Sequence, residues 1–294
     1  MALAVAAALP VARALGYGTP AHENLGTLLE GRWAAIEQSV GGRLGVAVLD
    51  TATGQVTGRR LDEGFAMCST FKVLAAALVL ARVDAQRERL DRRIVIRRED
   101  LLEWAPVTRQ HVGGAGMSVA ELCEAAITMS DNTAANLLLA SAGGPAGVTA
   151  FARRLGDVRT RLDRTEPALN EAVPGDARDT STPRAMALTL RKLMLGDGLS
   201  EAGRAQLVRW MSANTTGAHR LRAGVPPDWR VADKTGTGER GSTNDIGVLW
   251  PPRREPLVVV AYLTECKAPA AAREAALASV ARSVAGARAP SRAS

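Results

Sequence analysis

The chain is poor in aromatic residues, cysteine and histidine, and each shortage excludes a class of function. Aromatic residues are only 3% of the 294 residues, too few for the stacking surfaces on which single-stranded nucleic acids bind. The three cysteines are an odd number without paired spacing, and the three histidines are isolated. This pattern indicates neither a disulfide framework nor a zinc ligand set. We therefore expect chemistry without a metal and without a cofactor.

Lysine is also scarce, and the positive charge is not concentrated in one segment. The formal net charge is +7, but only four of the 37 basic residues are lysine, and the arginines are scattered among alanines. A nucleic-acid-binding surface would need a basic patch or stripe. We therefore expect no nucleic-acid partner. The hydrophobic content of 47% and the length suit a soluble protein with a large core, organised as one large domain or two smaller ones.

Long hydrophobic runs are missing as well, so no membrane span is expected. Residues 1–15 are dominated by Ala, Leu and Val but are too few to cross a bilayer, and Ala12-Arg13-Ala14 has the spacing of a signal cleavage site. The positively charged start of a usual signal is absent. We interpret residues 1–22 as an atypical export signal, with a disordered N-terminus as the alternative, and expect a secreted or periplasmic protein.

Hydrophobic periodicity predicts strands at both ends of the chain and helices between them. We expect a helix over 23–40, strands over 43–50 and 55–60, helices over 70–83, 118–128, 131–141, 145–155, 183–195 and 201–211, strands over 230–234, 245–250 and 257–263, and a last helix over 269–286. No strand is expected between Ser69 and Met211.

This order predicts an α/β fold with one antiparallel five-stranded sheet flanked by helices. The sheet domain would comprise residues 23–62 and 213–288, and residues 63–212 would form an inserted all-α domain. A binding site is expected at the seam between the two.

A serine and a lysine three positions apart open an apolar run. Ser69 and Lys72 precede residues 73–80, which are only Val, Leu and Ala. Residues i and i+3 share a helix face, so the Lys72 amine is expected beside the Ser69 hydroxyl. An adjacent base is the usual means of activating a serine, and the N–H groups of a helix N-terminus can stabilise an oxyanion. Because Ser-x-x-Lys often arises by chance, other segments must support this interpretation.

Three further segments carry polar residues at places suited to a site. Ser130-Asp131-Asn132 opens a predicted helix, Lys234-Thr235-Gly236-Thr237-Gly238 ends a predicted strand, and Glu166 and Asn170 lie in an irregular stretch over 157–182. Their structural alternatives are a helix cap, a polar strand end and a disordered loop.

Taken together, these motifs closely resemble the class A serine β-lactamases, whose Ser-x-x-Lys, Ser-Asp-Asn and Lys-Thr-Gly triplets are established for the family. The resemblance covers roughly residues 25–285. It implies hydrolysis of the β-lactam amide of penicillins and cephalosporins through a serine acyl-enzyme, and hence antibiotic resistance. It also implies small-molecule β-lactams as the only partners of a monomeric protein.

The resemblance assigns roles by position. The implied catalytic residues are Ser69 as nucleophile, Lys72 as its neighbour and candidate base, Ser130 as proton relay to the leaving nitrogen, Glu166 as deacylation base, and Lys234 as partner of Ser130 and of the substrate carboxylate. The implied substrate-binding residues are Trp104, Asn132, Asn170, Arg220, Thr235, Gly236 and Thr237. Backbone N–H groups of Ser69 and Thr237 would form the oxyanion hole. Whether Lys72 or Glu166, acting through a water, takes the proton from Ser69 stays open. In the family, a pair matching Arg164 and Asp179 closes the long loop.

The sequence departs from the family pattern at three places. Thr243 stands where many relatives have a carboxylate-binding arginine, and we expect Arg220, in preference to Arg222, to supply that charge. The position that would pair with Cys68 in the carbapenem-hydrolysing branch is Gly238. The position that would pair with Cys123 in other branches is Ala76. Neither family disulfide is therefore expected, and carbapenem turnover stays open.

Two other functions share part of this pattern. A penicillin-binding DD-peptidase has the three triplets but lacks the deacylation machinery, and a β-lactam sensor is acylated and stays so. Glu166 with Asn170 distinguishes this chain from both.

Overall fold

The computed structural model describes residues 20–288. The predicted export signal over residues 1–22 therefore lies outside the described residues, apart from its last three. No helix in the described part of the chain combines the length and the hydropathy needed to cross a membrane.

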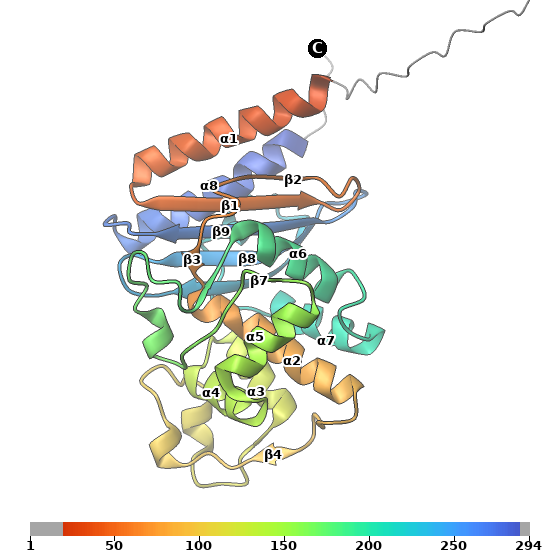
Figure 1. Ribbon diagram of the computed structural model, residues 1–294, viewed down its shortest axis with the longest axis vertical. Helices are drawn as coiled ribbons and strands as arrows, with labels where there is room; N and C mark the ends of the chain where they lie inside the picture. Colours follow the sequence, from red (N-terminus) through yellow and green to blue (C-terminus); the bar gives the residue numbers. More distant parts are fainter. Residues whose placement is uncertain (1–19, 289–294) are drawn as a thin grey trace, which may run out of the picture.

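A five-stranded antiparallel sheet is built from both ends of the chain, as predicted (Figure 1). Its strand order is β2-β1-β9-β8-β7. The strands are β1 (Arg43–Asp50), β2 (Val56–Arg59), β7 (Arg230–Thr237), β8 (Thr243–Trp250) and β9 (Leu257–Thr264). The sequence-predicted fold class is confirmed. Strand β7, which carries the Lys-Thr-Gly motif, is the edge strand nearest the helical layer (Figure 1).

The two faces of the sheet pack against different helices because successive side chains of a strand point to opposite sides. In β1, Leu44 and Val46 belong to a core with Trp33 of α1 (Pro20–Val40) and Val280 of α8 (Ala270–Arg288). Ala47, the next residue along β1, belongs to the core on the opposite face. Helices α1 and α8 thus cover one face. Helix α6 packs on the opposite face, and the other helices extend from there past β7 (Figure 1).

The second layer is a group of helices around α2 (Lys72–Asp84), whose residues 73–80 are all buried. A helix that is apolar on every side is expected at the centre of such a group. The surrounding helices are α3 (Val119–Thr128), α4 (Asn132–Ser141), α5 (Gly144–Arg154), α6 (Pro183–Met194) and α7 (Glu201–Ser212). The N-termini of α3, α4, α6 and α7 are capped by the side chains of Ser118, Asp131, Thr182 and Ser200, which satisfies N–H groups that the helix leaves free.

The expectation of no strand between Ser69 and Met211 was wrong. Residues Arg93–Ile94 (β4) pair with Met117–Ser118 (β5), and Thr180–Ser181 (β6) pair with Phe65–Ala66 (β3). Strands of two residues are too short to show an alternating pattern, so periodicity could not reveal them. The helix expected from residue 70 also begins later: a 3₁₀ turn, Cys68–Phe71, precedes α2.

Candidate active site

Ser69 lies in the 3₁₀ turn that leads into α2, between an amine and a carboxylate. Lys72 Nζ donates a hydrogen bond to Ser69 Oγ at 2.8 Å, and the Ser69 hydroxyl donates to Glu166 Oε1 at 3.1 Å. Ser69 is 7% exposed and Lys72 is fully buried. The serine hydroxyl therefore has two candidate proton acceptors within hydrogen-bond distance, which is the geometry that activates a nucleophile.

Lys72 connects three of the sequence motifs. Besides Ser69, its Nζ contacts the Ser130 backbone oxygen at 2.9 Å, Asn132 Oδ1 at 2.6 Å and Glu166 Oε1 at 3.0 Å. Burial lowers the pKa of Lys72, while the charge of Glu166 and the hydrogen bond to it raise that pKa; the net direction is downward. A lysine whose pKa is lowered is more readily neutral, as a base must be.

The Ser130-Asp131-Asn132 segment is fixed by its middle residue. Asp131 is fully buried and accepts hydrogen bonds from the backbone N–H groups of Val107 at 3.0 Å, Thr108 at 2.9 Å and Ala134 at 2.9 Å. Ser130 has φ 56°, in the left-handed region that non-glycine residues rarely adopt. Such a backbone persists only where surrounding contacts enforce it, and the bonds of Asp131 provide that enforcement.

Lys234 reaches the same centre from β7. Its Nζ donates to Ser130 Oγ at 3.1 Å and to the Thr235 backbone oxygen at 2.9 Å. Burial lowers the pKa of Lys234 well below its usual value, and the nearby charge of Lys72 lowers it further. Lys72 Nζ also lies 3.3 Å from Ser130 Oγ, so the two amines share one serine hydroxyl and each favours the neutral form of the other.

Gly236 allows β7 to lie against the nucleophile turn. A Cβ atom there would stand 2.8 Å from the Met67 backbone oxygen and 3.3 Å from Cys68 Cβ. Any larger residue would force the strand away from Ser69. The glycine of the Lys-Thr-Gly motif is therefore explained by a close approach of two backbones. The neighbouring Thr235 hydroxyl hydrogen-bonds the hydroxyl of Thr216.

Glu166 is held at both its backbone and its side chain. Asn136 of α4 donates to the Glu166 backbone oxygen at 2.9 Å and accepts from the Glu166 N–H at 3.0 Å. Asn170 Nδ2 donates to Glu166 Oε2 at 2.5 Å. Asn170 Oδ1 is buried and has no hydrogen-bond partner among the described residues. Glu166 and Asn170 thus present a carboxylate and a free acceptor side by side.

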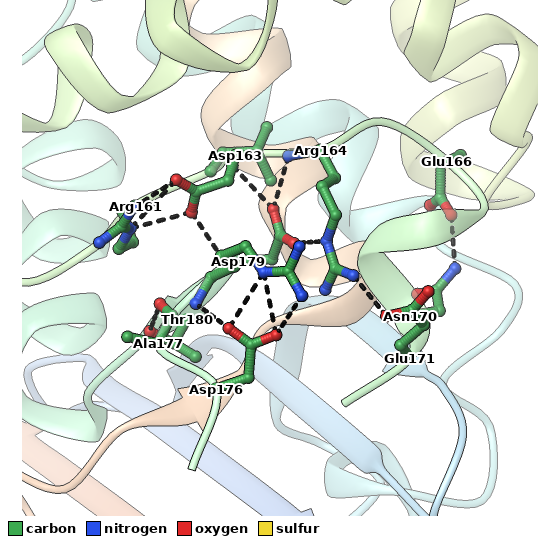
Figure 2. A network of polar contacts seen from close by, with 12 residues as sticks. Arg161, Asp163, Arg164, Glu166, Asn170, Glu171, Asp176, Ala177, Asp179 and Thr180 are labelled. Atoms are coloured by element: carbon green, nitrogen blue, oxygen red, sulfur yellow. Dashed lines mark hydrogen bonds and ion pairs between the residues drawn. The ribbon is translucent and has the colours of Figure 1, made fainter. Parts of the chain in front are cut away.

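The loop that carries Glu166 is closed by a network of charges, shown in Figure 2. Arg164 Nε lies 2.6 Å from Asp179 Oδ2, and Arg164 Nη1 lies 2.6 Å from Glu171 Oε2. Asp179 also accepts from the backbone N–H groups of Asp163 and Arg164, at 2.8 and 2.9 Å. The two ends of the loop are therefore joined by a carboxylate that is 1% exposed.

Arg220 and Arg222 have different surroundings. Arg220 Nη2 donates to Thr237 Oγ1 at 2.8 Å, and its Nη1 donates to the backbone oxygens of Gly236 and Asn244 at 3.0 and 2.8 Å. Arg222 Nη2 is instead 2.5 Å from Asp233 Oδ1. The structure therefore places Arg220, and not Arg222, at the end of the motif strand.

Two residues near the start of α8 contact Arg220 and Thr243. Glu274 Oε1 lies 3.2 Å from Arg220 Nη2, and Arg273 Nε donates to Thr243 Oγ1 at 2.9 Å.

Trp104, the remaining predicted residue, is 55% exposed; its backbone oxygen accepts from the Asn132 N–H at 2.9 Å. Trp104 is therefore a surface residue attached to the Ser130–Asn132 segment.

All three cysteines are buried and unpaired. Burial raises the pKa of the Cys68 thiol to about 12. A Cβ atom at Gly238 would lie 2.6 Å from Cys68 Sγ, so Gly238 stands directly against this thiol.

Sequence reasoning missed three residues that shape the site. They are Asn136, which clamps Glu166; Asn244, which donates to the Met67 backbone oxygen at 3.1 Å; and Glu274, which contacts Arg220. Only Asn136 carried a signal, because it lies one helical turn after Asn132 and so faces the same side.

The chain is similar to known proteins over most of its length. The model of the Beta-lactamase enzyme family matches residues 29–287. The chain is 54% identical over 251 residues to β-lactamase CTX-M-8 of Citrobacter amalonaticus, covering 85% of this chain and 86% of the relative. It is 50% identical over 283 residues to β-lactamase OXY-1 of Klebsiella oxytoca, covering 96% of each. An ancestral class A β-lactamase structure superposes with a TM-score of 0.87 at 64% identity, covering 88% of this chain and 99% of the other.

Proposed function

The chain belongs to the class A serine β-lactamases, and from that premise we propose which of its residues carry out each step. The protein is a hydrolase that opens the β-lactam amide of penicillin- and cephalosporin-type antibiotics through a serine acyl-enzyme, and it thereby confers resistance. The assignments that follow are supported by the contacts described above.

Acylation begins at Ser69. Its Oγ attacks the lactam carbonyl carbon and forms a tetrahedral intermediate whose oxyanion is bound by the backbone N–H groups of Ser69 and Thr237. The Ser69 proton passes to Lys72 or toward Glu166, because Lys72 Nζ and Glu166 Oε1 both lie within 3.1 Å of the Ser69 hydroxyl. The C–N bond then breaks, and Ser130 donates its proton to the departing nitrogen. The proton taken from Ser69 replaces it through Lys72, whose Nζ lies 3.3 Å from Ser130 Oγ. Lys234, 3.1 Å from the Ser130 hydroxyl, supports this transfer.

Deacylation uses Glu166 and Asn170. The Glu166 carboxylate removes a proton from a water that the free Asn170 oxygen orients, and the resulting hydroxide attacks the ester carbonyl. The ester C–O bond breaks, Glu166 returns the proton that it took from the water to Ser69 Oγ, 3.1 Å away, and the opened penicilloate or cephalosporoate leaves. This step distinguishes the chain from a DD-peptidase or a β-lactam sensor.

The remaining predicted residues bind substrate in this scheme. Lys234, Thr235, Thr237 and Arg220 surround the position of the substrate carboxylate, with Gly236 admitting the ligand to the edge of β7. Asn132 binds the acylamide side chain, and exposed Trp104 contacts it from the rim. We further propose a monomer exported from the cytoplasm, with the sheet domain and the helical domain meeting at this site.

The contact of Ser69 Oγ with Lys72 and Glu166 carries this proposal. If Glu166 activates the water, Glu166→Ala should still be acylated by a penicillin but turn over at least about 10²-fold more slowly, as expected when a positioned base is lost. Intact-mass spectrometry should then show a long-lived adduct one substrate heavier.

A matched control is Glu239→Ala, because Glu239 is an exposed carboxylate near the same loop. That variant should hydrolyse nitrocefin at the wild-type rate without accumulating an adduct. Rapid turnover by Glu166→Ala would contradict the assigned role.

A further inference from the structure

A basic hollow lies at the opposite end of α2 from Ser69. It has a volume of about 600 Å³ and is lined by the end of α2, by α5 and by the segment after α6. Helices α2 and α5 lie side by side (Figure 1). The polar residues that line it are Arg82, Arg87, Arg154, Lys192 and Asp197. Four cations therefore face a single carboxylate.

None of these four cations forms an ion pair with a carboxylate in the described part of the chain. By contrast, Arg89 and Arg92, which line the adjoining hollow together with Arg82, are paired with Asp91 and Glu88 at 2.9 and 2.6 Å. Unpaired cations that converge on one concave surface repel each other unless an anion neutralises them. Glu88 is near enough for its charge to act on Arg82 but forms its ion pair with Arg92. The hollow thus keeps an excess of positive charge.

Arg82 and Lys192 also have N–H groups that make no hydrogen bond in the described part of the chain. Arg82 Nε is buried without a hydrogen-bond partner among the described residues, and its Nη2 makes only a long contact of 3.5 Å to the Arg87 backbone oxygen. Lys192 Nζ donates to the Leu155 backbone oxygen at 2.8 Å, which leaves further N–H groups of the ammonium. Arg154 lies over the Phe151 ring, with its Cζ 5.4 Å from the ring centroid, which restrains it at the rim.

We propose that this hollow binds a compact anion carrying several phosphate charges, such as an oligophosphate or the phosphorylated headgroup of a lipid. Arginine guanidinium groups match phosphate oxygens with paired hydrogen bonds, and a multivalent anion is needed to neutralise several cations at once. The apolar floor of Leu78 and Phe151 excludes water beneath the charged rim, which strengthens such contacts. The site is separate from the β-lactam site, since α2 alone spans about 20 Å.

The direct test is calorimetric titration of the full chain with sodium tripolyphosphate at about 0.15 M ionic strength, where surface charges are well screened. We expect one saturable site per chain and a rise in Tm with ligand concentration. The double variant Arg82→Gln/Arg87→Gln should bind at least about tenfold more weakly, because two charge-assisted hydrogen bonds are lost. Orthophosphate should bind more weakly than tripolyphosphate to the wild type.

The control is the double variant Arg98→Gln/Arg254→Gln, which removes the same two charges from exposed residues outside the hollow. It should bind tripolyphosphate as the wild type does, and both variants should hydrolyse nitrocefin normally. Absence of saturable binding would overturn the proposal. An equal loss in Arg98→Gln/Arg254→Gln would also overturn it, because it would show general charge attraction only. Vesicles of phosphatidylcholine with phosphatidic acid identify the source: sedimentation that tripolyphosphate reverses indicates a headgroup, and no sedimentation indicates a free anion.

Discussion

Lys72 Nζ lies 3.0 Å from Glu166 Oε1, and both side chains are completely buried. Glu166 therefore has two effects on the nucleophile: it accepts a hydrogen bond from Ser69 and it stabilises the charged form of the lysine beside it. Burial acts in the opposite direction and is the larger effect. The protonation state of Lys72 is thus set by a balance that a single substitution can shift.

The first prediction concerns that balance. Glu166→Gln removes the carboxylate charge that raises the pKa of Lys72, so this pKa should fall further below its ordinary value. The measurement is an NMR titration of the ¹³C-labelled lysine ε-carbons in the wild type and the variant. Lys267 is an internal control, because it lies outside the site. An unchanged or higher Lys72 pKa in Glu166→Gln would show that the ion pair does not control this group.

The second prediction concerns the loop of Figure 2. Arg164→Ala leaves the buried Asp179 carboxylate without its cation, and breaking a buried pair costs about 3–5 kcal/mol. Because Arg164 is partly exposed, we expect the lower part of this range in urea unfolding. Deacylation should slow more than acylation, since the loop carries Glu166 and Asn170.

Arg161→Ala is the matched control for that loop. Arg161 pairs with Asp163 at the surface, where such pairs contribute about 0–1 kcal/mol. Equal destabilisation by the two variants would contradict the special role given to the Arg164–Asp179 pair.

The third prediction distinguishes the two arginines near β7. Arg220→Ala should lower kcat/KM for penicillins by about 10- to 150-fold, the equivalent of one charge-assisted hydrogen bond. Arg222 lies two positions after Arg220, and Arg222→Ala removes a guanidinium that is bound to Asp233. It should change kcat/KM much less, but it should lower the Tm, because the buried Asp233 carboxylate loses its cation. Thermal unfolding of both variants separates these effects, and a larger kinetic loss in Arg222→Ala would reverse the assignment.

The fold was predictable because its signals are local or ordered along the chain. Alternating residues in 43–50 and 257–263 predicted strands, and the apolar run after Ser69 predicted a buried helix. The register of the sheet and its strand order depend on packing between segments about 200 residues apart. The pairing of Arg43 with Thr264 is an example that no local pattern indicates.

The residues of the site likewise fall into a group that the sequence reveals and a group that only the fold reveals. Each motif is a contiguous stretch, so its residues could be named from the sequence. The supports of the motifs come from elsewhere: Asn244 of β8 fixes the turn before Ser69, and Glu274 of α8 contacts Arg220. An asparagine in a strand and a glutamate in a helix are ordinary residues until the fold brings them to the site.

The last prediction concerns a carboxylate buried behind Arg220. Asp245 is fully buried, and its Oδ2 accepts from the Leu221 N–H at 3.0 Å, whereas Oδ1 has no hydrogen-bond partner among the described residues. Burial raises the pKa of Asp245 well above its ordinary value, and the charge of Asp233 raises it further. Arg220 and Lys234 act in the opposite direction but do not prevail.

A raised carboxyl pKa means that charged Asp245 destabilises the folded state at pH values above that pKa. The cost is relieved as the pH falls through the folded pKa, and it is absent below the unfolded value of about 3.9. Asp245→Asn keeps an oxygen for Leu221 and removes the charge, so it should raise Tm at pH 7–8 by about 2–4 °C for each kcal/mol gained. This advantage over the wild type should shrink toward pH 4. Asp228→Asn, at an exposed carboxylate, should match the wild type throughout. A lower Tm for Asp245→Asn at pH 8 would show that the charge of Asp245 stabilises Arg220 and Lys234 by more than its burial costs.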